Sequence, residues 1–89
     1  MKYKFRTKGV CASYIEFSLN DGIISNVSFY GGCNGNLRAI SKLVEGKNAE
    51  EIISILSGNI CGFKKTSCAD QLSIALRGAL DGVLEPVND

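Results

Sequence analysis

The sequence contains no histidine, and this absence restricts the chemistry open to the chain. Histidine is the usual general base at neutral pH and a common metal ligand. Ten basic and nine acidic residues leave a net charge of +1, so the chain as a whole has no strong field to attract nucleic acid or acidic partners. Any reactive or metal-binding site is therefore expected to depend on cysteine.

Long apolar runs are also absent, and none approaches the length that crosses a bilayer. The chain opens with Met-Lys-Tyr-Lys-Phe-Arg, which lacks the apolar core of a signal peptide. We therefore expect a cytoplasmic protein that does not enter a membrane. Cytosolic thiols are kept reduced, so the four cysteines favour metal binding or redox chemistry over a disulfide framework. The length of 89 residues fits a single domain over residues 1–89.

Alternating residues in the first third predict three strands. The first strand is expected from Lys2 to Lys8, with basic residues on one side. A second alternating run places three apolar residues inward: Ile15, Phe17 and Leu19. Asn20-Asp21-Gly22 predicts a type I′ hairpin turn, because these residues accept a positive φ. A third strand from Ile23 to Tyr30 would complete an antiparallel meander.

After the third strand the apolar period becomes that of a helix. The first helix carries its apolar residues at helical spacing and is expected to end before Gly46. Those residues are Leu37, Ile40, Leu43 and Val44. A second, short helix should begin at Asn48, with Glu51 placed as in a capping box, and end before Gly58. Its apolar residues are Ile52, Ile53, Ile55 and Leu56.

Residues 59–66 show no period and are expected to form a loop. Ser67, with Asp70 three residues on, should then open the longest helix, which is expected to reach about Leu84. Its apolar stripe is Leu72, Ala75, Leu76, Ala79, Leu80 and Val83. These elements predict an α+β fold in which three helices pack on one face of the meander.

The cysteines lie at the joints between the predicted elements: Cys11, Cys33, Cys61 and Cys68. The turn between the first two strands of a meander lies at the same sheet end as the exit of the third, so topology brings Cys11 and Cys33 together. Cys33 and Cys68 open helices, where free N–H groups and the macrodipole stabilise a thiolate. Four thiolates suit a closed site for zinc, our first choice, or for an iron–sulfur cluster.

The spacing leaves alternatives open, because the paired Cys-x-x-Cys of many zinc sites is missing. Disulfides, or thiols that share no site, are the other readings. The residues expected to line the site are Tyr30, Gly32, Asn34 and Asp70.

The run Thr66-Ser67-Cys68-Ala69-Asp70 resembles the signature of the TSCPD domain family, which is named for Thr-Ser-Cys-Pro-Asp. Upstream segments also resemble landmarks of that family: Gly32-Cys33-Asn34-Gly35-Asn36, Ala39-Ile40-Ser41, Glu45-Gly46 and Cys61-Gly62. Ala69 replaces the proline of the motif, and the first turn of a helix accepts either residue.

The TSCPD domain occurs alone and as a C-terminal tail of adenosylcobalamin-dependent ribonucleotide reductases, where its cysteines are associated with metal. The resemblance implies a metal-binding accessory role near ribonucleotide reduction, with a reductase or another larger enzyme as partner. Catalysis by the chain alone is not expected. A resemblance to ribonucleoside-diphosphate reductases would come from the domain that the chain shares with the tail of those enzymes. The alternative is a thiol redox or iron–sulfur or sulfur-carrier partner that uses Cys61 and Cys68. Nucleic acid, which the charge does not support, and a small homo-oligomer stay open.

A more distant resemblance is to the NifU/IscU iron–sulfur scaffolds, which share the order of elements. Cys11, Cys33 and Cys68 resemble the three cluster ligands of those scaffolds. Ser13 stands where the scaffolds carry an aspartate that keeps the cluster labile, and Cys61 is an additional cysteine. A fourth thiolate should close the site, so this resemblance implies the fold more than the transfer of a cluster.

Overall fold

The structure is a computed structural model that describes residues 1–10, 12–31, 34–58 and 66–87. Three antiparallel strands are followed by three helices, which confirms the predicted α+β order. The elements are β1 (Lys2–Arg6), β2 (Tyr14–Asn20), β3 (Ile23–Tyr30), α1 (Asn34–Val44), α2 (Ala49–Leu56) and α3 (Cys68–Leu80). The loop predicted over residues 59–66 lies outside the described residues, apart from Thr66.

The strands form one antiparallel sheet in the order β1-β2-β3, as the meander requires. The turn between β2 and β3 has the predicted geometry, since Asp21 has φ 54 and Gly22 has φ 79. Both central residues of a type I′ turn need a positive φ. Local chemistry at two residues therefore sets where the hairpin reverses.

A β-bulge interrupts the pairing of β2 with β3. The register shifts between Glu16 and Ser18, so that two residues of β3, Asn26 and Val27, oppose one residue of β2. Asn26 has φ 54, a conformation that asparagine adopts more readily than most residues. As a result Ile24 and Val27, three positions apart, are both buried on the same side of the sheet.

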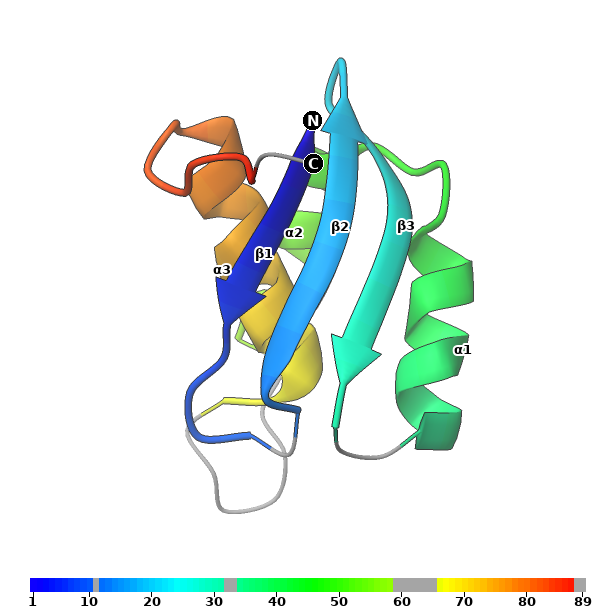
Figure 1. Cartoon of the computed structure of the whole chain (residues 1–89). Coiled ribbons are helices and arrows are strands. Elements are labelled where there is room, and N and C mark those ends of the chain that lie inside the picture. The colour runs from blue at the N-terminus through cyan, green and yellow to red at the C-terminus, as the bar shows by residue number, and fades with distance from the viewer. Residues whose placement is uncertain (11, 32–33, 59–65, 88–89) are drawn as a thin grey trace.

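Figure 1 shows α2 and α3 behind the sheet and α1 alongside β3. The buried apolar residues of the strands meet those of the helices between these layers: Tyr3, Ile15, Phe17, Leu19, Ile24, Val27, Val44, Ala49, Ile52, Ile53, Leu72, Ala75, Leu76 and Ala79. The opposite face of the sheet carries no helix in Figure 1. The sheet is thus covered on one side and exposed on the other.

The junction between α1 and α2 is fastened to the hairpin end of the sheet. Gly46 N donates to Ile24 O at 2.8 Å, and Ala49 N donates to Gly22 O at 2.8 Å. Asn48 caps α2, as predicted, by accepting from the N–H of Glu50 at 2.9 Å. Since α2 starts at the hairpin end, it finishes toward the opposite end of the sheet, where α3 begins (Figure 1).

The end of α3 differs from the sequence expectation. The helix stops at Leu80 and not near Leu84, and Val83, placed in the apolar stripe, is 81% exposed. Gly82 takes φ 77, which leaves the helical conformation, and the amides of Val83 and Leu84 both donate to Gly78 O at 2.9 Å. The chain therefore turns back at this point.

One other expected boundary and two expected positions also differ. β1 ends at Arg6, two residues before Lys8. Leu43 and Ile55 were assigned to apolar stripes, yet they are 71% and 63% exposed. Helical spacing fixes an approximate face, and residues at its margin point to solvent. Within the described residues, no helix combines the length and apolar character required to span a bilayer.

Candidate metal centre

The Thr66–Gln71 segment starts α3 and gives Cys68 its position. Ser67 is the N-cap, with extended backbone at φ −143, and its hydroxyl accepts the N–H of Asp70 at 3.0 Å. An N-cap side chain satisfies one of the free amides at the start of a helix. Cys68 is consequently the first residue of α3, where it is half-buried and forms no disulfide.

Asp70 joins the end of α2 to the start of α3. One carboxylate oxygen accepts the backbone N–H of Gly58 at 2.7 Å, and the other accepts the hydroxyl of Thr66 at 2.5 Å. Gly58 and Thr66 flank residues 59–65, the segment that contains Cys61 in the sequence. One side chain therefore holds both described neighbours of that segment against the helix that begins with Cys68.

Gln71 links the same helix to the turn after β1. It is buried, with 6% exposed, and its amide donates to the hydroxyl of Thr66 at 3.1 Å. Its side-chain oxygen accepts the backbone N–H of Lys8 at 3.1 Å, and Gly9 approaches the Thr66 methyl group closely enough that an added Cβ would lie 3.7 Å from it. Lys8 and Gly9 precede Cys11 in the chain.

A second set of bonds joins the residues after Cys11 to the end of β3. Ser13 N donates to Tyr30 O at 2.6 Å, and Thr7 N donates to Ser13 O at 3.2 Å. The Thr7 hydroxyl also donates to the carbonyl oxygen of Ala12. Tyr30 precedes the segment with Cys33, so the described residues next to Cys11 and Cys33 meet at one end of the sheet.

The predicted ligands are only partly covered by the described residues. Cys68 is described, whereas Cys11, Cys33 and Cys61 lie outside the described residues. Among residues 1–10, 12–31, 34–58 and 66–87, no three cysteine or acidic side chains gather closely enough to hold a metal ion. The four-cysteine site therefore stays a prediction.

The residues expected to line the site are placed as follows. Tyr30 ends β3, Asn34 begins α1, Asp70 lies in the first turn of α3, and Gly32 lies outside the described residues. The Asp70 carboxylate accepts hydrogen bonds from Gly58 and Thr66, so it joins two chain segments to the start of α3. In chemical terms, three further thiols beside Cys68 would suit zinc or an iron–sulfur cluster, both of which prefer thiolate ligands.

The linking roles of Thr66 and Gln71 were not predicted from the sequence. A polar glutamine directly before Leu72, at the start of the apolar stripe, was the available signal, because a buried amide needs partners. Which partners it finds depends on packing, and Lys8 is 63 positions away along the chain.

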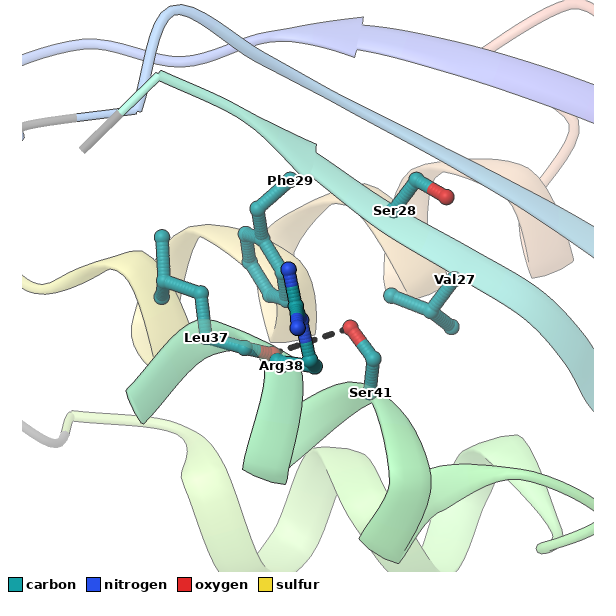
Figure 2. A pocket seen from close by; sticks show the side chains of 6 residues that line it. All are labelled: Val27, Ser28, Phe29, Leu37, Arg38 and Ser41. Atoms are coloured by element: carbon teal, nitrogen blue, oxygen red, sulfur yellow. Dashed lines mark hydrogen bonds between the residues drawn. The ribbon is translucent and has the colours of Figure 1, made fainter. Parts of the chain in front are cut away.

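A separate hollow lies between β3 and α1 (Figure 2). Its volume is about 190 Å³, and its lining residues are Val27, Ser28, Phe29, Leu37, Arg38 and Ser41. The Ser41 hydroxyl donates to Leu37 O at 2.9 Å, the bond drawn in Figure 2. This volume is below the range of about 300–1,000 Å³ typical of small-molecule sites, so the hollow does not suggest an active site.

The fold and the Thr66–Gln71 network define the class of protein: an α+β chain of three strands and three helices with a cysteine opening its last helix. A family model, the TSCPD domain, matches residues 1–80 of this chain. The chain therefore belongs to the TSCPD domain family, as its signature predicted. Searches of curated proteins and of solved structures gave no match. The resemblance to NifU/IscU scaffolds stays a prediction.

Proposed function

We propose that this chain is a metal-binding accessory module in which Cys11, Cys33, Cys61 and Cys68 hold zinc or an iron–sulfur cluster. Its partner would be a larger enzyme, with a ribonucleotide reductase as the first choice because the family also occurs as a tail of such enzymes. When bound, the metal would cross-link the chain segments that carry the four thiols, and folding would be coupled to metal binding.

The observation that carries this proposal is the hydrogen-bond network of the Thr66–Gln71 segment. It ties Lys8 and Gly58, neighbours in sequence of Cys11 and Cys61, to the start of α3, where Cys68 lies. The bond from Ser13 to Tyr30 adds the neighbour of Cys33 at the same end of the sheet. Fixed supports of this kind orient metal ligands and reduce the entropy lost on binding.

The test is elemental analysis and optical absorption of the full chain purified without oxygen, followed by thermal melting with and without a chelator. A zinc site would give a colourless protein with a stoichiometric amount of zinc per chain. A cluster would give visible absorption together with iron and sulfide. We expect chelation to lower the melting midpoint by more than about 10 °C, since loss of a tightly bound ligand removes several kcal/mol.

Variants make this test specific. Cys68→Ser should abolish stoichiometric metal, and Ser54→Ala, on the exposed side of α2, should leave it unchanged. The proposal would be refuted if the chain binds no metal in any preparation and the chelator does not change its melting midpoint. If that metal-free chain also shows one fast-reacting thiol and supports a reductase, the redox alternative with Cys61 and Cys68 takes its place.

A further inference from the structure

The uncovered face of the sheet gathers basic and aromatic side chains in register. We call this the outer face, and its paired residues include Lys2, Lys4, Arg6, Tyr14, Glu16, Ser18, Ser25, Ser28 and Tyr30. Arg6 pairs with Tyr14, which pairs with Tyr30, so one row across all three strands holds a cation and two rings. We propose that the outer face binds a single strand of nucleic acid, with phosphates on the basic residues of β1 and a base stacked on Tyr30.

The two tyrosines form a stack with one open end. Their ring centroids are 4.5 Å apart, and the rings are inclined by 13°. Lys4 Nζ lies 4.2 Å from the centroid of Tyr14. Because β2 lies between β1 and β3, Lys4 and Tyr30 approach Tyr14 from opposite sides. Tyr30 is therefore the end of the stack that a base can extend, and it is 39% exposed.

Hydrogen bonding orients the Tyr30 ring in advance. Its hydroxyl donates to Glu16 Oε1 at 2.9 Å. A ring that is already oriented loses little conformational entropy when a ligand stacks on it. Stacking on tyrosine also tolerates any sequence, because every base has an aromatic face.

The cations of β1 line the edge of the outer face. Lys2, Lys4 and Arg6 occupy alternate positions of an extended strand and are spaced by about 6.7 Å. This is comparable to the separation of successive phosphates in an extended single strand. The ion pairs found in the described part of the chain involve Arg77, so none of the three is paired with a carboxylate there.

Local charge on the outer face differs from that of the whole chain. It carries three basic residues and one acidic residue, Glu16, whose carboxylate accepts a hydrogen bond from the Tyr30 hydroxyl. The net charge of +1 for the whole sequence hides this separation, because acidic residues lie elsewhere. A polyanion is therefore attracted to this face in particular.

A hollow beside the stack has the volume of a small ligand site. It measures about 360 Å³ and is lined by Lys4, Arg6, Tyr14 and Val87. Val87 N donates to Lys2 O at 2.8 Å, which holds Val87 against β1 at the side of the hollow. Two cations beside one hollow suit a phosphate with its attached sugar. A duplex, with its bases already stacked inside, could not use the open ring.

The test is fluorescence anisotropy of the full chain with labelled oligothymidylate of about 12 nucleotides at about 50 mM salt. We expect a dissociation constant on the order of 10⁻⁵ M and a slope of about −2 for log K against log salt, as about 0.7 per phosphate predicts for three contacts. Amide shifts in NMR should map to the three strands and not to the helices. The cations and rings involved all lie in the described sheet, so the proposal holds whether or not the cysteines bind metal.

Four variants separate the contributions of charge and stacking. Arg6→Gln should reduce the magnitude of the salt slope by about 0.7, whereas Lys42→Gln, an exposed cation on α1, should not change it. Tyr30→Ala should weaken binding by at least about fivefold, and Tyr30→Phe, which keeps the ring but loses the bond to Glu16 that orients it, should weaken binding less than Tyr30→Ala does.

Three results would overturn the proposal: no binding at millimolar protein, equal effects of Arg6→Gln and Lys42→Gln, or equal competition by oligoglutamate, which would indicate an acidic peptide site. Circular dichroism checks the fold of Tyr30→Ala. If that variant is unfolded, the slope comparison of the two charge variants decides.

Discussion

Asp70 provides the sharpest test of how the start of α3 is held together. Its carboxylate accepts two hydrogen bonds, from Gly58 N at 2.7 Å and from the Thr66 hydroxyl at 2.5 Å. A hydrogen bond to a charged group contributes about 1.5–3 kcal/mol, and the half-buried position of Asp70 favours the lower end. Asp70→Ala should therefore lower the free energy of unfolding by about 2–4 kcal/mol.

The assay is thermal melting of the metal-free chain, so that the result does not depend on the proposed metal site. A loss of that size corresponds to a fall in the melting midpoint of about 10–20 °C for a chain of this length. Asp70→Asn should cost less, about 1 kcal/mol, because the amide oxygen can accept from Gly58 while its NH₂ group donates to the Thr66 hydroxyl.

Asp81→Ala is the matched control, since Asp81 lies at the other end of α3. Its carboxylate is 52% exposed and lies 3.5 Å from Arg77. An exposed pair contributes little, so the midpoint should move by no more than roughly 2 °C. If Asp70→Ala and Asp81→Ala have the same melting midpoint, the two hydrogen bonds of Asp70 do not stabilise the fold and the reasoning fails.

Three further predictions concern the core, the hairpin and the outer face. Leu76→Ala, at a fully buried position, should cost about 2–5 kcal/mol in urea denaturation, and Leu43→Ala, 71% exposed, should stay within about 0.5 kcal/mol. Gly22→Ala should cost about 1–2 kcal/mol through its φ of 79 alone, because no atom lies near the added Cβ; an unchanged denaturation midpoint would contradict the type I′ assignment. The hydrogen bond to Glu16 raises the pKa of Tyr30. Glu16→Gln should therefore lower that pKa in an NMR titration. The bond's contribution to stability is complete below the ordinary tyrosine pKa and is lost as pH rises through the raised value.

Sequence patterns predicted the elements because each depends on neighbouring residues. The two-residue period and the Asp21-Gly22 turn are local, and so is the Asn48 cap of α2. The bulge at Asn26 is not visible in this way. A strict alternation cannot bury both Ile24 and Val27, so their common orientation follows from pairing with β2 and from packing on the helices.

Helix ends were predicted less well for a related reason. The expected extension of α3 to Leu84 rested on apolar spacing, which Val83 continues. The actual end depends on a positive φ at Gly82 and on two amides that share the Gly78 carbonyl. Leu84 then packs against the core from outside the helix.

For the candidate site, the sequence predicted Cys68 at the start of a helix but not the hydrogen bonds that hold this helix start in place. Cys68 at the start of a helix follows from the Ser67 cap, a local signal. The bonds from Gln71 to Lys8 and from Asp70 to Gly58 join residues far apart in the chain. No periodicity encodes such contacts, because each requires the sheet and two helices to be packed first.

These supports give the family signature two separable roles. Cys68 offers a sulfur atom and, among the hydrogen bonds described, Asp70 and Gln71 carry the links to other segments. Cys68→Ser keeps those links and should leave melting of the metal-free chain near the parent value, whereas Asp70→Ala keeps every thiol and lowers it. Stability of the metal-free chain therefore reports on the links, and metal content reports on the thiols. Should Cys68→Ser destabilise the metal-free chain as strongly as Asp70→Ala, the sulfur would itself be part of the packing, and loss of metal in that variant would no longer identify a ligand.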